Sequence, residues 1–148
     1  MNPKIPEVLM ELSGLVAFNA QPDVDPADRA SALGLTAMLL AVAAQEFDRA
    51  AARHVEENRA VRALLARGAA VVADAALAER LRSLAATADE DLRVSALQAA
   101  NSALRAGLIE LHAAVEAVDG AEAKALESEI WSELVVSTER RVLAGAPV

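Results

Sequence analysis

The stretch AVAAQEFDRAAARHVEENRAVRALL, residues 41–65, decides the fold of this chain. Together with the residues just before it, this stretch places apolar side chains in two heptad-spaced rows, which we call the seam. The two rows are Leu33, Leu40, Phe47, His54 and Val61, and, four residues after each of these, Ala37, Ala44, Ala51, Asn58 and Leu65. This spacing is typical of helices that pack side by side at a shallow angle. His54 and Asn58 interrupt the seam with polar groups, and the interruption needs an explanation.

Length and composition also favour a helical chain. Its 148 residues suffice to bury a core, aromatic residues make up only 2%, and alanine, leucine, arginine and glutamate dominate. The absence of cysteine excludes disulfides, thiolate nucleophiles and cysteine-bound zinc. We expect one helical-bundle domain over residues 1–148, with an N-terminal helix and linker in residues 1–24 and a flexible tail at residues 144–148.

Start and stop signals divide the chain into helices. The first helix runs from Pro6 to near Asn19, and Asp25 followed by Pro26 begins a main helix of roughly 40 residues, which Gly68 ends. A shorter helix follows, capped by Asp74. Thr87-Ala88-Asp89-Glu90 has the form of a capping box for the next helix, which Asp119-Gly120 ends.

The last two helices carry apolar stripes of their own. The stripe of the first comprises Val94, Leu97, Asn101, Leu104, Leu108, Leu111, Val115 and Val118, and that of the second Leu126, Ile130, Trp131, Leu134, Val135, Thr138 and Val142. We therefore expect an all-α fold: an antiparallel bundle of three to four long helices plus a short N-terminal helix, with coiled-coil-like packing. Because the main helix is longer than one small domain can cover, we also expect a homodimer.

Charge argues against two classes of partner. The net charge of -8 and the isoelectric point near 4.7 disfavour nucleic acids and anionic membrane surfaces, which attract basic proteins. The longest uncharged run, residues 30–45, is shorter than the roughly 20 apolar residues of a spanning helix, and the N-terminus lacks the pattern of a signal peptide. We expect a cytoplasmic protein that binds neither nucleic acid nor membrane.

Four polar residues are candidates for a polar layer or a ligand site inside the bundle: His54, Asn58, Asn101 and His112. Within a seam, such residues fix helix register and oligomeric state, and this is the first interpretation. Carboxylate-bridged di-iron bundles need Glu three residues before His, a spacing that neither histidine has. A mononuclear zinc site is the remaining metal alternative, because His112 and Glu116 lie one turn apart. We expect no cofactor.

Other residues are candidates for an interface. Phe47 and Trp131 are large anchors, and Glu46, Arg49 and Arg53 form a charged row that flanks the seam, either as solvated ion pairs or as a docking edge. No serine stands in a G-x-S-x-G elbow, and the glycines form no phosphate-binding loop or dinucleotide fingerprint. These patterns do not predict an enzyme.

The sequence thus predicts a non-catalytic, helical protein-interaction module that self-associates and docks a partner protein as an adaptor or chaperone. In its long helices and acidic composition the chain resembles small export chaperones, such as those of flagellar export, and this resemblance is one of shape and composition alone. The alternative is a bundle that binds a small ligand or a metal between its helices through His54, Asn58, Asn101 and His112.

Overall fold

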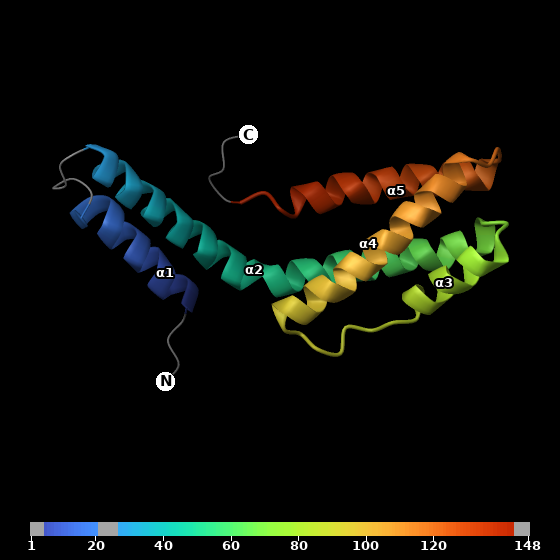
Figure 1. Cartoon of the computed structure of the whole chain (residues 1–148), viewed down its shortest axis with the longest axis horizontal. Coiled ribbons are helices and arrows are strands. Elements are labelled where there is room, and N and C mark those ends of the chain that lie inside the picture. Colours follow the sequence, from blue (N-terminus) through green and yellow to red (C-terminus); the bar gives the residue numbers. More distant parts are fainter. Residues whose placement is uncertain (1–4, 21–26, 144–148) are drawn as a thin grey trace. The chain divides into compact units, whose positions relative to one another are not determined.

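The structure, a computed structural model, describes residues 5–20 and 27–143 (Figure 1). Its elements, in order, are α1 (Ile5–Gly14), the π-helix η1 (Leu15–Ala20), α2 (Ala27–Val71), α3 (Ala75–Ala85), α4 (Val94–Glu116) and α5 (Ala121–Glu139). The described residues contain helices and no strand, and the helices pack against one another in a bundle-like arrangement, which confirms the predicted fold class. The predicted Asp25 cap and the predicted tail at residues 144–148 lie outside the described residues.

The chain divides into two compact units. The first, the N-terminal hairpin, comprises the described part of Met1–Ala50: α1, η1 and the first half of α2. The second, the C-terminal bundle, is Ala51–Val142 and comprises the rest of α2 with α3, α4 and α5. Helix α2 therefore contributes to both units.

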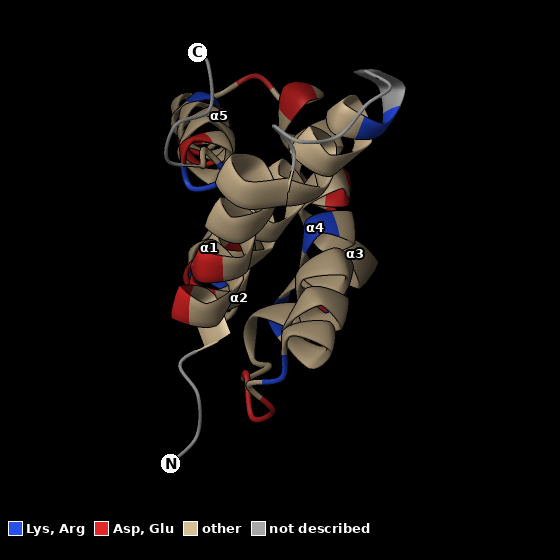
Figure 2. Cartoon of the chain, turned by 90° about the vertical axis from the view of Figure 1, so that its left-hand side faces the viewer, with Lys and Arg blue, Asp and Glu red and all other residues tan. Residues whose placement is uncertain are grey.

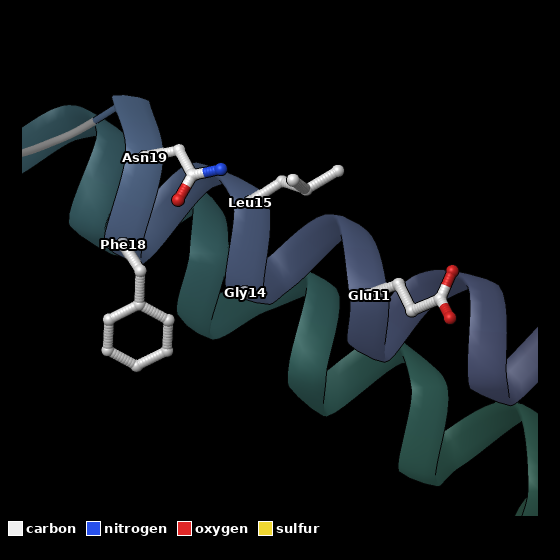
Figure 3. A pocket seen from close by; sticks show the side chains of 5 residues that line it. All are labelled: Glu11, Gly14, Leu15, Phe18 and Asn19. Atoms are coloured by element: carbon white, nitrogen blue, oxygen red, sulfur yellow. The ribbon is translucent and has the colours of Figure 1, made fainter.

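In the N-terminal hairpin, α1 lies beside the first half of α2 (Figures 1 and 3). The Ser13 hydroxyl donates a hydrogen bond of 2.7 Å to the carbonyl of Ala37, which ties the two helices together. The buried apolar residues described in this unit are all alanines, namely Ala37, Ala44 and Ala50. Because an alanine buries little apolar area, this hairpin has no core of large side chains among its described residues.

The C-terminal bundle has a continuous core of leucine and other aliphatic residues. Its buried members are Val61, Leu64, Leu65, Ala69, Leu77, Leu81, Leu104, Leu108, Leu111, Val115, Ala123, Leu126 and Ile130. Two glycines allow helices to approach closely: a Cβ on Gly68 would lie 2.4 Å from the Leu111 side chain, and a Cβ on Gly107 would lie 2.5 Å from Leu84. All four helical segments of this unit contribute to the core, which makes it a helical bundle.

Several predicted boundaries need correction. Helix α2 continues past Gly68 to Val71, because Gly68 is a packing position against Leu111 and not a stop. Residues 86–93 form a loop in place of the predicted capping box, and α4 begins at Val94. This helix ends at Glu116, before the predicted stop at Asp119-Gly120. The Asp74 cap is confirmed, since its carboxylate accepts hydrogen bonds from the amides of Ala76 and Leu77.

The predicted inner faces are also partly wrong. Phe47, which the heptad count placed in the seam, is 61% exposed, and Trp131 is 53% exposed. Four valines of the predicted stripes are exposed as well: Val94, Val118, Val135 and Val142. The predicted stripes therefore include the buried face of each helix together with side chains on the neighbouring, exposed face, such as Trp131 beside the buried Ile130.

Candidate functional site

A buried polar layer lies toward the end of the C-terminal bundle at which α4 begins and α5 ends. Asn58 on α2 is fully buried, and its side-chain oxygen accepts a hydrogen bond of 3.0 Å from the amide nitrogen of Asn101 on α4. The Asn58 amide nitrogen donates in turn to Asp89 at 2.9 Å and to the carbonyl of Leu97 at 3.4 Å. The two asparagines thus join α2, α4 and the loop before α4.

A buried carboxylate extends this layer to α5. The Glu57 side chain is 1% exposed, and it accepts hydrogen bonds from Asn101, from the hydroxyl of Ser137 at 3.2 Å, and from the guanidinium of Arg141 at 2.7 Å. Arg141 also donates to the Ser137 carbonyl at 3.0 Å. Since an isolated buried charge is strongly disfavoured, these donors are what makes burial of Glu57 tolerable.

The loop at residues 86–93 is held by a second ion pair. The Arg62 guanidinium meets the Asp89 carboxylate in a two-pronged contact of 2.6 and 2.9 Å and also donates to the Thr87 hydroxyl at 3.1 Å. Hydrogen bonds from Arg62 and, to a lesser degree, from Asn58 hold the pKa of Asp89 below its usual value. The same contact raises the pKa of Arg62.

The chemistry of this layer is structural. The carboxylates of Glu57 and Asp89 and both asparagines direct their hydrogen bonds at one another and at arginines of the same unit. Such a network can be satisfied in only one alignment of α2, α4 and α5, so it specifies register more than it adds stability. The Ser137 hydroxyl donates to the Glu57 carboxylate, and Asn101 and Arg141 donate to the same carboxylate, so its acceptor positions serve to hold α4 and α5 on α2.

The structure brings part of the predicted polar layer together. Asn58 and Asn101 are in direct contact, and His54 is buried one turn before Asn58 on α2. His112 lies elsewhere, because it is eleven residues beyond Asn101 on α4, about 16 Å along the helix axis. Its imidazole instead packs edge-on against the Trp131 ring, with ring centroids 5.2 Å apart and an interplanar angle of 85°.

Sequence reasoning missed the charged half of the layer. Glu57 and Arg62 flank the seam, where charges are usually solvated, and Asp89 was assigned to a helix cap. The signal that could have found them is the juxtaposition of Glu57 and Asn58: two polar residues beside a seam need partners once their helix is covered on both sides.

The candidate interface residues are divided between the two units. Phe47 is exposed, Glu46 and Arg49 are half-buried, and all three belong to the N-terminal hairpin. Arg53 is half-buried and Trp131 is exposed, and both belong to the C-terminal bundle. The five residues therefore do not form a single surface within either unit.

The N-terminal hairpin exposes most of its large apolar side chains. Those at least 36% exposed in this unit are Ile5, Val8, Met10, Leu12, Leu15, Phe18, Leu35, Met38, Leu39 and Phe47. A hollow of about 360 Å³ on α1 and η1 is lined by Glu11, Gly14, Leu15, Phe18 and Asn19. In Figure 3 the Phe18 ring projects from the helix. In Figure 2 the α1 ribbon carries acidic segments and no basic one.

One described helical segment, Arg29–Val71, is long and apolar enough to cross a membrane by length and composition alone. Its most apolar window has a mean hydropathy of 1.4, and 11% of that window is buried. Core helices of globular proteins meet the same criterion, but a core helix is mostly buried, and this window is not.

No protein-family model matches the sequence, and no curated protein or solved structure matches it.

Proposed function

We propose that this protein is a non-catalytic association module in which the N-terminal hairpin joins a second copy of the chain and the C-terminal bundle is the rigid body that it carries. The proposal is carried by one observation: every large apolar side chain described in the hairpin is at least partly exposed, and its buried apolar residues are alanines. The docking of a further protein, as by an adaptor or a chaperone, is the use that such a dimer would serve.

The arrangement of side chains on α2 supports self-association. Ala37 and Ala44 are buried, whereas Leu35 and Leu39, one turn apart on another face, are 53% and 55% exposed. Fully burying a leucine stabilises a protein by about 1.5–3 kcal/mol, so a hairpin that exposes its leucines gains much from a partner that covers them. Two hairpins that pair through these faces would form a four-helix arrangement with a leucine core.

Membrane insertion of the hairpin is the second candidate, favoured by the apolar window within Arg29–Val71. The uncharged run at residues 30–45 spans about 24 Å as a helix, less than the roughly 30 Å of a hydrocarbon core. Helix α1 also carries Glu7 and Glu11, whose burial in lipid would be strongly disfavoured. These charges favour a protein partner over a lipid one.

The test is sedimentation equilibrium of the untagged chain over a wide concentration range. We expect the wild type to dimerise reversibly, and Leu39→Glu to raise the dissociation constant at least about 100-fold, because it places a charge at the centre of the proposed interface. The matched control is Ile109→Glu on α4, since Ile109 is 71% exposed and lies in the other unit. This variant should dimerise as the wild type does.

Three outcomes would contradict the proposal. A wild type that stays monomeric at all concentrations removes the need for a partner copy. Equal weakening by Leu39→Glu and Ile109→Glu shows a general charge effect and no specific interface. Co-sedimentation of monomeric protein with phosphatidylcholine vesicles, abolished by Leu39→Glu, would favour the membrane instead.

A further inference from the structure

The junction of α4 and α5 brings together three side chains that ligate metals. His112 and Glu116 lie one turn apart on α4, with Nε2 of the imidazole 3.7 Å from the Glu116 carboxylate. Glu127 on α5 completes the group, and one ligand atom from each residue lies within 4.8 Å of the others. The sequence shows the first two residues as a pair, and only the packing of α5 on α4 adds the third.

The imidazole is held in place for this role. Nε2 of His112 is a buried atom that makes no hydrogen bond with any described residue, although the side chain as a whole is 20% exposed. The edge-on contact with Trp131 fixes the ring from the α5 side. A buried nitrogen without a hydrogen-bond partner is disfavoured in a merely structural setting, and a metal ion is one group that satisfies it.

We infer that His112, Glu116 and Glu127 form a binding site for a divalent cation of the zinc class. One nitrogen and two carboxylate oxygens match the mixed ligands that Zn²⁺ accepts, whereas Mg²⁺ and Ca²⁺ prefer oxygen alone. In a tetrahedral zinc site, bond lengths of about 2.1 Å put neighbouring ligand atoms about 3.4 Å apart. Separations of up to 4.8 Å must therefore shorten by up to about 1.4 Å, which rotation of the Glu116 and Glu127 side chains can supply.

The site differs from the polar layer in its chemistry. In the layer, arginine and asparagine donors already satisfy the carboxylates, while no lysine or arginine of the described residues forms an ion pair with Glu116 or Glu127. With three protein ligands, a bound ion keeps a fourth position open to solvent or to a donor from another molecule. The site would join α4 to α5 in addition to the packing of their apolar faces.

The experiment is a titration of chelator-treated, untagged full-length protein with Zn²⁺. Calorimetry and tryptophan fluorescence are its two readouts. Trp131 is the only tryptophan, so its emission reports directly on the His112 ring beside it. We expect one equivalent of Zn²⁺ to bind with a saturable change in emission, and Mg²⁺ to leave both signals unchanged. Glu127→Gln and His112→Gln should each weaken Zn²⁺ binding at least about tenfold.

The control is Glu122→Gln, which removes an exposed carboxylate from the first turn of the same helix and should leave binding unchanged. Because His112→Gln also alters the contact with Trp131, circular dichroism of each variant establishes that it folds, and Glu127→Gln tests the site without touching that contact. The inference is overturned if the wild type takes up no stoichiometric Zn²⁺, if Glu127→Gln binds as the wild type does, or if Glu122→Gln weakens binding as much as Glu127→Gln.

Discussion

The two units of this chain use the same helical residues in opposite ways. The C-terminal bundle encloses Leu65, Leu81 and Leu111 completely, whereas the N-terminal hairpin buries alanines and exposes Leu35, Met38 and Leu39. Both have helices of apolar character, so hydrophobic content alone does not make a core. A core forms where helices surround a side chain on several sides, and a two-helix hairpin cannot do this by itself.

The polar residues follow the same division. In the bundle, Glu57, Asn58 and Asn101 are buried and hydrogen-bonded to one another or to neighbouring donors. In the hairpin, the Ser13 hydroxyl donates a hydrogen bond from α1 to the Ala37 carbonyl of α2. The bundle therefore specifies its own register through hydrogen bonds between buried side chains.

Replacing one leucine in each unit by alanine should give the largest difference in the free energy of unfolding. Leu65→Ala empties a fully buried position, and we expect it to lower the free energy of unfolding of the bundle by about 2–5 kcal/mol. Leu39→Ala, at a position 55% exposed, should change that free energy by less than about 0.5 kcal/mol and weaken self-association instead. Urea unfolding at a protein concentration below the dimer dissociation constant measures the free energy of unfolding of both variants.

An equal loss of stability in the two variants under these conditions would contradict this prediction. That result would mean that Leu39 belongs to a core within the single chain.

Removal of the Asp89 carboxylate should have an intermediate effect that depends on pH. Asp89→Asn replaces a half-buried group that accepts from Arg62 and Asn58, and we expect a loss of about 1–3 kcal/mol at neutral pH. Because the pKa of Asp89 is lowered in the folded protein, its carboxylate stabilises the fold above the unfolded value of about 3.9. That contribution disappears as the pH falls through the lowered pKa.

The measurement is urea unfolding of wild type and variant between pH 7 and pH 2, where the difference between the two should shrink below about pH 4. Asp119→Asn is the control, since Asp119 is exposed and its replacement makes the same change in net charge. A difference between wild type and Asp89→Asn that stays constant over this range would show that the ion pair with Arg62 does not hold the loop.

The sequence predicted the helices well and the extent of their buried faces less well, and the reason is physical. Periodicity reports which residues share a helix face, so Val61, Leu65 and the stripe from Leu97 to Val115 were placed correctly. It does not fix how wide a face the neighbouring helices cover, and this is why Phe47 and Trp131, which were also candidate interface residues, were placed on inner faces and are exposed within the single chain. The two asparagines were recognised as seam residues, which the structure confirms as buried.

The partners of those asparagines could not be read from the sequence. Asp89 and Ser137 lie 31 residues from Asn58 and 80 residues from Glu57 along the chain, and only the packing of the loop and of α5 brings them near. The zinc-class site has the same origin, because Glu127 is far from His112 until α5 packs on α4. Contacts of this kind depend on the relative rotation of helices, which a single helix's periodicity leaves undetermined.

Replacing a glycine by alanine in each unit should change stability by the smallest amounts and in opposite directions. Around Gly14 in the hairpin, an added Cβ would meet only Phe18 among the described residues, at 4.0 Å, so Gly14→Ala should stabilise α1 by up to about 1 kcal/mol through helix propensity.

At Gly107 in the bundle, an added Cβ would lie 2.5 Å from Leu84 and 3.6 Å from Leu65. Gly107→Ala should therefore destabilise α4 by about 1 kcal/mol despite the better propensity, because the Leu84 side chain must move within a packed core. Amide hydrogen exchange should show slower exchange in α1 for Gly14→Ala and faster exchange in α4 for Gly107→Ala. Faster exchange in α1 after Gly14→Ala would reveal that the hairpin is as tightly packed as the bundle.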